Sequence, residues 1–238
     1  MRHRIAFVLL ALAAAACGAF AHAANAAAPA QPRLQLRSAS TDVTLFQYGG
    51  KHVYLDLGVY VQSLGANFQL NVTRRYGHPI EVAQVKGATE SALPGWVAGG
   101  WNGMNNFLRY SVRDASGRVV WRRAETFCPD DYGMQRVNPS GPLTPSFPQY
   151  CSANPFTLGM VWGIDKGWAT PLADAAPSPK IDTGRYTITV RIAKRYADLF
   201  GIPAGDAVRT VSAVVKKGSD GGCPPFCGDA RQATSRSQ

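Results

Sequence analysis

Apolar and polar residues alternate with a period of two along several stretches of this chain. The clearest stretches are 53–61, 68–72 and 186–192, where Val, Leu, Ile, Phe or Tyr occupies every second position. An alternation of this kind places one face of a strand on a core and the other face in water, as in an antiparallel sheet. The pattern therefore predicts half-buried strands at these three places.

Further strands and one hairpin follow from the same pattern. The run from Asp114 to Gly117 is typical of a hairpin connection, because Asp, Ser and Gly favour turns. The other expected strands are near 43–48, 80–85, 107–112, 118–121 and 208–215, and one short helix is expected around 193–200. Roughly seven or eight strands with turn residues between them indicate an all-β fold, an antiparallel β-sandwich.

The strand pattern covers residues 36–217, which we expect to form one β-sandwich domain. Residues 24–35 are rich in Ala and Pro and predict a flexible lead-in. Residues 129–155 contain four prolines within a stretch of ten residues and predict a long irregular loop, a kind of segment that is often functional. Residues 218–238 form a polar tail that contains two cysteines, and its end is expected to be disordered.

The N-terminus has the pattern of a secretory signal peptide. Basic residues in 1–4 precede an apolar run at 5–16, and Ala21-His-Ala23 fits a cleavage site, so residues 1–23 are expected to be removed. The apolar run is too short to favour a membrane anchor. Lipid attachment at Cys17 is a rival, but the Leu that usually stands three positions earlier is missing. The sequence thus predicts a secreted or periplasmic protein without a transmembrane segment.

Four cysteines remain after the expected cleavage, an even number in an exported chain. Four cysteines allow three pairings. We expect the pairs Cys128–Cys151 and Cys223–Cys227, because each closes a local loop rich in Pro and Gly. Zinc is the rival interpretation, but the cysteine spacing is poor and little histidine remains to help, so disulfides are preferred and no metal is expected.

The chain is basic, with 25 Lys and Arg against 15 Asp and Glu. Such a charge attracts anionic polymers or membranes, or keeps a protein soluble. The basic residues form no run longer than a pair. A surface that binds nucleic acid usually clusters its charge, so this scatter favours solubility and no nucleic-acid partner is expected.

Few residues are suited to catalysis. The expected mature chain has two histidines, His52 at a strand start and His78 before a proline, and neither lies in a nucleophile motif. Phosphate-binding and dinucleotide-binding fingerprints are absent, and no cofactor is expected. Acidic residues leave one enzymatic alternative, a carboxylate-based hydrolase around Asp130, Asp131 and Asp165. The competing interpretation of the adjacent pair is a calcium ligand or a solvated turn.

Three stretches resemble the lysyl oxidases and their bacterial relatives. They are residues 99–120 followed by Phe127-Cys128, residues 161–168 with a Gly/Trp loop, and residues 181–188 with an Ile-Asp…Gly-x-Tyr strand. The likeness spans about half of the expected mature chain. It implies a β-sandwich, copper held by a His-x-His-x-His run, and a quinone made from Tyr and Lys that oxidises primary amines.

The residues needed for that chemistry are not matched. Ala98, Gly100 and Asn102 stand where the three copper-binding histidines are expected, and copper prefers imidazole among nitrogen donors. The quinone Tyr has no clear counterpart near Trp168. The resemblance therefore implies a relative that kept the scaffold and lost the oxidase activity. We expect a non-catalytic binding module at the cell envelope or outside the cell, with a divergent amine oxidase, the hydrolase or a structural envelope protein as alternatives.

A binding surface is predicted in residues 154–168, which combine aromatic side chains with three glycines and show no steady alternation. Glycine lets a backbone approach closely, and Trp offers a flat apolar face, so the pair suits a carbohydrate, another envelope polymer or a protein ligand. The candidate residues are Phe156, Trp162, Asp165, Lys166 and Trp168. In the competing interpretation, Phe156 and Trp162 belong to the core and the glycines shape a corner between sheets. A third interpretation buries Trp162 and presents Trp168 beside Asp165 and Lys166.

Overall fold

The computed structural model describes residues 30–130, 132–151, 154–172 and 176–218. These residues form fourteen strands in three sheets and one short helix, α1 (Lys194–Phe200). The prediction of an all-β fold is confirmed. Within the described ranges, no helix has the length and apolar character needed to cross a membrane.

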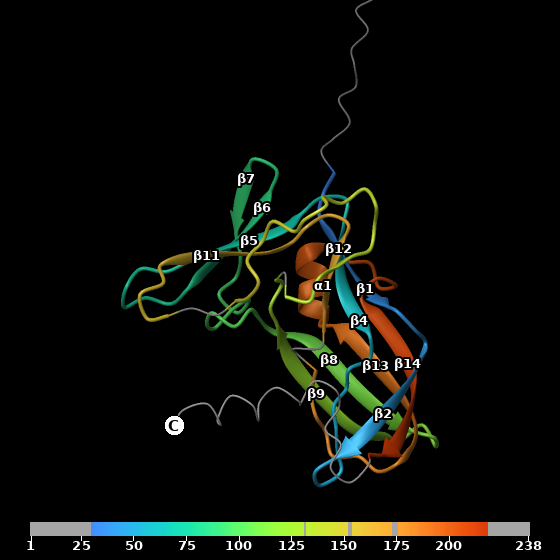
Figure 1. The fold of residues 1–238 in the computed structure, drawn as a ribbon. Coiled ribbons are helices and arrows are strands. Elements are labelled where there is room, and N and C mark those ends of the chain that lie inside the picture. Colours follow the sequence, from blue (N-terminus) through green and yellow to red (C-terminus); the bar gives the residue numbers. More distant parts are fainter. Residues whose placement is uncertain (1–29, 131, 152–153, 173–175, 219–238) are drawn as a thin grey trace, which may run out of the picture.

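The largest sheet has six strands (Figure 1). In spatial order they are β3 (His52–Val53), β2 (Asp42–Tyr48), β14 (Val208–Lys217), β13 (Gly184–Ile192), β8 (Met104–Asp114) and β9 (Val119–Phe127). The strands β2 and β14 run parallel, whereas the other neighbours run antiparallel. The sheet is therefore mixed and not purely antiparallel as predicted. An alternating pattern marks a half-buried strand but does not determine the direction of the neighbouring strand.

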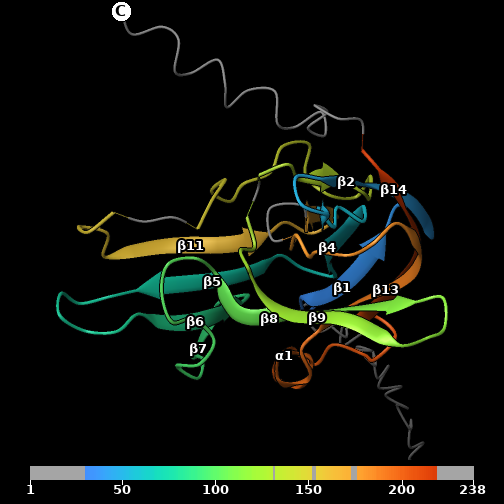
Figure 2. The same cartoon turned by 90° about the horizontal axis from the view of Figure 1, so that it is seen from below.

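Two four-stranded sheets complete the fold. The first contains β1 (Arg33–Ser38), β4 (Val59–Leu64), β12 (Trp168–Pro171) and β10 (Gln135–Arg136), and the second contains β11 (Gly159–Ile164), β5 (Phe68–Thr73), β6 (Glu81–Lys86) and β7 (Thr89–Ala92). Figure 2 shows β5, β6, β7 and β11 extending to one side of β1, β13 and β14. Buried side chains of all three sheets belong to one continuous hydrophobic core.

The strand count differs from the predicted seven or eight because several strands are too short to show a pattern. The strands β3 and β10 have two residues each. The stretch 53–61 is not one strand: Leu55 and Leu57 are buried, but residues 54–58 form no ladder, and Gly58 has a φ of +59°. The alternation in this stretch reflects which side chains are buried. Its backbone hydrogen bonds are not those of a strand ladder; the Leu55 N–H, for example, donates to the Pro177 carbonyl.

The predicted hairpin connects β8 and β9. The carboxylate of Asp114 accepts hydrogen bonds from the Ser116 hydroxyl and from the backbone N–H groups of Ser116 and Arg118. These bonds, the Ser116 hydroxyl first, lower the pKa of Asp114 below its usual value. Gly117 occupies the left-handed region with φ +82°, which costs glycine little.

The predicted disulfide between Cys128 and Cys151 is confirmed, with Cα atoms 5.7 Å apart. The expected pair Cys223–Cys227 lies outside the described residues, as does the predicted signal peptide. In its described residues, the proline-rich segment between Cys128 and Cys151 is a long irregular loop, as predicted, apart from the two-residue strand β10. The N–H groups of Val137 and Asn138 donate to the Gly167 carbonyl and fix part of the loop.

Candidate functional site

The five residues predicted to bind a ligand do not form one surface. Trp162 lies in β11 with 1% of its surface exposed, and Trp168 in β12 has 8% exposed. The Trp168 indole N–H donates to the Pro142 carbonyl at 3.0 Å. Phe156, by contrast, is 79% exposed. Both tryptophans are therefore buried in the core, whereas Phe156 is exposed.

Residues 159–164 of this segment form the regular strand β11, although the segment shows no steady alternation. Residues of β11 pair with β5, and the last three, Trp162, Gly163 and Ile164, are all buried. A Cβ atom at Gly163 would overlap the ring of Phe147. The strand lacks alternation because both of its faces are covered at this end, and the glycine leaves space for an aromatic ring.

Asp165 is a buried acceptor inside the fold, with 1% of its surface exposed. Its carboxylate accepts hydrogen bonds from Ser146 N–H at 2.6 Å, from the Ser146 hydroxyl at 2.8 Å and from the Asn67 amide at 3.1 Å. The backbone N–H of the exposed Lys166 donates to the Asn67 side chain. The carboxylate therefore ties the proline-rich segment to the β11–β12 turn.

The remaining residues considered for chemistry are also dispersed. His52 lies 3.1 Å from the Ser178 carbonyl through Nδ1, and His78 is exposed in the β5–β6 turn. Asp130 accepts from the Tyr132 N–H, and Asp131 is outside the described residues. Among the described side chains, no group of three His, Cys, Asp or Glu lies close enough to hold a metal ion.

The three positions at which the lysyl-oxidase resemblance would require copper-binding histidines lie in the loop between β7 and β8. Ala98 is buried, Gly100 is half-buried and Asn102 is exposed. The backbone of Val97 is held by its hydrogen bonds with Asn105 and with the Tyr196 hydroxyl. The loop is thus packed onto α1, and these three positions offer at most one polar side chain.

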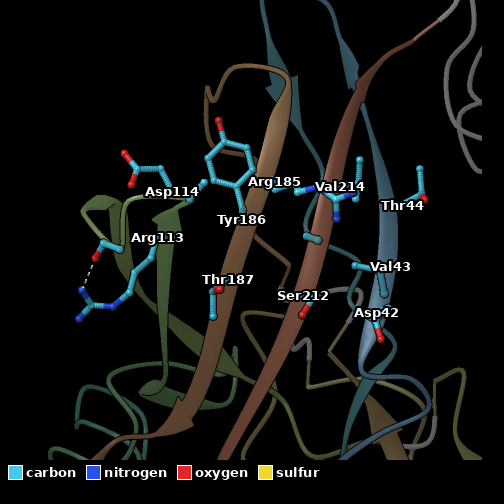
Figure 3. Close-up of a pocket in the computed structure, with 13 residues that line it drawn as sticks. Asp42, Val43, Thr44, Arg113, Asp114, Arg185, Tyr186, Thr187, Ser212 and Val214 are labelled. Atoms are coloured by element: carbon cyan, nitrogen blue, oxygen red, sulfur yellow. Dashed lines mark hydrogen bonds between the residues drawn. The ribbon is translucent and has the colours of Figure 1, made fainter.

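A groove that sequence reasoning did not predict crosses one end of the six-stranded sheet (Figure 3). It has a volume of about 560 Å³. It is lined by residues of β2, β14, β13 and the β8–β9 hairpin, which include Asp42, Thr44, Arg113, Asp114, Arg185, Tyr186, Thr187 and Ser212. Figure 3 shows Asp42, Ser212 and Thr187 pointing away from the sheet on the same side.

The alternation in the central strands explains why this face is polar. Val211, Ala213 and Val215 of β14 are buried, so Ser212 faces outward. In register with it lie Asp42 of β2 on one side and Thr187 of β13 on the other. Thr187 is opposite Arg113 of β8. One row across four strands thus carries a carboxylate, two hydroxyls and a guanidinium.

Several polar groups of the groove have free hydrogen-bonding capacity. The side chains of Arg185, Thr187 and Ser212 make no hydrogen bond or ion pair with any described residue. Arg113 donates to the Gly117 carbonyl at 2.8 Å, and one Asp42 carboxylate oxygen accepts from the Thr41 hydroxyl. Tyr186 donates to the Asp182 carbonyl, and partial burial raises the pKa of its phenol. The groove is rich in donors that a polar ligand can satisfy.

The sequence held a partial signal for this site. Thr187, Thr189 and Arg191 occupy the outward positions of a clear strand pattern. The pattern does not show which residues lie beside them on the neighbouring strands. Arg113 and Thr187 are 74 positions apart in the sequence, and only the strand register brings them together. Comparisons with family models, with curated proteins and with solved structures found no match for this chain.

Proposed function

We propose that this chain is an exported, non-catalytic binding module of the cell envelope or the extracellular space, and that the groove on the six-stranded sheet holds its ligand. The observation that carries the proposal is the set of uncommitted donors in the groove, Arg185, Thr187 and Ser212, on a rigid sheet. Binding sites combine a concavity with a few convergent polar groups, as here.

Export is supported by two independent features. The N-terminal residues follow the tripartite pattern of a signal peptide with a cleavage site near Ala23. The Cys128–Cys151 disulfide is a bond that persists in oxidising compartments such as the periplasm and the extracellular space. Both features favour a protein that works outside the cytosol.

Binding is favoured over catalysis by the state of the acidic groups. A general base must reach a substrate proton. Of the two carboxylates that line the groove, Asp114 accepts from Ser116 and Arg118, and one oxygen of Asp42 accepts from Thr41, so neither is paired with a second acid as a two-carboxylate mechanism requires. The carboxylate of Asp165 is buried and accepts three internal hydrogen bonds, which argues against the hydrolase alternative.

The resemblance to lysyl oxidases is part of the proposal as a likeness of scaffold. The stretches that carry much of it, residues 99–120, Phe127-Cys128 and 181–188, contribute to β8, β9 and β13. These strands are neighbours in one sheet. The proposed relative kept this sheet, lacks the histidines of the amine oxidase and uses the sheet surface for binding.

A polysaccharide is the ligand class that the groove suits best. Its hydroxyl and guanidinium groups match the alternating hydroxyls and ring oxygens of sugars, because each group donates in a defined direction. We would test the expected mature chain on immobilised polysaccharides, both neutral and acidic, and on peptidoglycan. The parent should be retained on at least one polymer. The double variant Arg185→Ala/Thr187→Ala should lose at least tenfold in affinity for it.

A matched control is Arg75→Ala in the β5–β6 turn, an exposed arginine without a hydrogen bond to a described side chain. It should bind like the parent. Both variants remove only exposed side chains, so their thermal unfolding should match that of the parent. Absence of binding to every polymer, or equal binding by the double variant and the parent, would refute the proposal.

A further inference from the structure

The outer face of the six-stranded sheet carries five exposed arginines. Arg109 and Arg113 come from β8, Arg122 from β9, and Arg185 and Arg191 from β13. In each strand, the residues next to these arginines face the opposite side of the sheet. All five arginines therefore project on the same side. We call this set the arginine face. The groove of Figure 3 is one end of it, because Arg113 and Arg185 line both.

The strand register determines the spacing of the arginine face. Arg191 lies directly opposite Arg109, and Arg122 lies opposite Ser111, between Arg109 and Arg113 along β8. Neighbouring strands are about 4.8 Å apart, and each residue advances about 3.3 Å along its strand. The six steps from Arg185 to Arg191 therefore extend about 20 Å. The positive charges form an elongated track along β13 and β8.

Hydroxyl groups fill the positions between the arginines. Ser111, Thr189 and Thr210 form one row across β8, β13 and β14, and Thr187 and Ser212 form the next. The hydroxyls of Thr189 and Thr210 are 3.2 Å apart. Arginines thus flank the hydroxyl groups along both β8 and β13.

Most of the arginine side chains of this face have no partner within the described part of the chain. The side chains of Arg109, Arg122, Arg185 and Arg191 form no ion pair or hydrogen bond there, and that of Arg113 donates to the Gly117 carbonyl. The nearby carboxylate of Asp42 lies in the same row as Arg113, at the groove end of the face. The carboxylate of Glu125 on β9 does not neutralise this face, because it pairs with Arg123 and lies on the opposite face from Arg122. Like charges directly opposite each other in a sheet are destabilising. An anion between Arg109 and Arg191 would remove that repulsion.

We propose that the arginine face is a linear binding track for an acidic polysaccharide. Its carboxylate or sulfate groups bridge the guanidiniums, whose planar fork of donors matches such oxyanions. Its sugar hydroxyls contact the Ser and Thr side chains between them. This inference rests on the proposed function, because the groove is the end of the track, and it adds the charge of the ligand and a second contact region at Arg109, Arg122 and Arg191.

Two other polyanions fit this face less well. Single-stranded nucleic acids are held by aromatic side chains on which bases stack. The outward positions of β8 and β13 from Arg109 to Arg113 and from Arg185 to Arg191 carry Arg, Ser and Thr and no aromatic residue. Membrane association by a folded surface is strengthened by inserted apolar groups beside the charge; these positions have none, and the exposed large apolar side chains in the strands of this sheet are Phe46 of β2 and Val119 and Val120 of β9.

The test compares two probes of each chemistry, a decasaccharide and a disaccharide of heparin for sulfate and of alginate for carboxylate. The parent chain should bind at least one decasaccharide at least tenfold more tightly than the matching disaccharide, with an affinity that falls as salt is added. The variant Arg109→Gln/Arg191→Gln should lose at least tenfold for that decasaccharide and less than threefold for its disaccharide, which fits within the groove.

The control Arg75→Gln/Lys86→Gln removes the same charge from the turn and strand of the second sheet. It should bind like the parent, since general attraction to a basic protein is not the proposed cause. The thermal midpoint of Arg109→Gln/Arg191→Gln should equal or exceed that of the parent, because a like-charge pair is removed. This measurement separates lost binding from lost folding.

The failure of this inference is distinct from failure of the proposed function. Binding of neutral polysaccharides in the groove without preference for acidic ones would overturn the inference and leave the function intact. Equal losses in both double variants, or tighter binding to single-stranded DNA or to phosphatidylserine vesicles than to either decasaccharide, would also overturn it. Absence of binding to any polysaccharide would refute both proposals.

Discussion

Replacing Asp165 by Asn removes a buried negative charge and keeps the shape of the side chain. The carboxylate accepts three hydrogen bonds, two from Ser146 and one from Asn67, and its residue is 1% exposed. An amide has a single acceptor oxygen, so its NH₂ group must face one or more of these donors. The substitution therefore tests whether Asp165 serves the fold, as the structure indicates, or a ligand, as the sequence predicted.

The expected loss follows from the donors left behind. If the amide oxygen stays with the Ser146 hydroxyl and the Asn67 amide, the Ser146 N–H loses its acceptor. A bond to a charged group contributes about 1.5–3 kcal/mol. Ser146 is itself exposed, so water replaces part of that bond. We expect Asp165→Asn to lower the free energy of unfolding by about 2 kcal/mol, and the thermal midpoint by about 4–8 °C.

Urea unfolding followed by tryptophan fluorescence measures this change directly, because Trp162 and Trp168 are buried on either side of Asp165 in sequence. The control is Asp198→Asn, which removes an exposed carboxylate paired with Lys194 in α1. Exposed ion pairs contribute at most about 1 kcal/mol. Equal stability of Asp165→Asn and the parent would refute the role of Asp165 in the fold. A simultaneous loss of polysaccharide binding would point instead to a role in ligand binding.

Three further outcomes are expected. Cys128→Ser/Cys151→Ser should lower the free energy of unfolding by about 3 kcal/mol, since the disulfide closes a loop with a sequence separation of 23; unchanged urea midpoints would contradict this. Trp168→Ala should cost about 3–5 kcal/mol in a thermal scan, whereas a surface binding residue would leave stability nearly unchanged. Asp114 has a lowered pKa in the folded state, so its stabilising effect is present above the unfolded value of about 3.9 and is lost as pH falls through the lower folded pKa. Ser116→Ala should reduce this loss in unfolding measured between pH 5 and 2, and identical pH profiles would count against it.

Period-two patterning was sufficient for the strands that have one covered and one open face. The strands β5 and β13 and the helix α1 lie within one or two residues of the predicted ranges. The pattern failed where a strand is covered on both faces, as at Trp162 to Ile164, because continuous burial has no alternation. It also failed at Leu55 and Leu57, which are buried without being in a strand.

Aromatic residues near glycines were a poor guide to the site, for a physical reason. Trp and Gly occur together at a binding surface, but also where a ring packs over a bare backbone, as Phe147 does at Gly163. Sequence alone does not distinguish these cases. The buried Asp165 shows the same ambiguity, because a carboxylate beside polar loops suits a ligand or a set of internal donors equally well.

The arginine face shows what a linear view of charge leaves out. The five arginines lie in three segments of the sequence, and none is adjacent to another of the set. Scatter along the chain suggested a solubilising charge. Register then places Arg109 opposite Arg191 on one face of one sheet. The arginines cluster because of how the strands pair, and the pattern of a single sequence does not specify that pairing.

That pairing carries the strongest argument for a ligand on this face. A solubilising charge can stand anywhere on a surface, and the least costly arrangement separates like charges or alternates them with carboxylates. Here Arg109 of β8 and Arg191 of β13 are directly paired in register on one face, while the carboxylate of Glu125 is on the other side of the sheet beside Arg123. The proposed binding accounts for this arrangement, because a pair of like charges costs stability in the free protein and the complex regains it when an oxyanion lies between the two arginines. Solubility alone does not account for it.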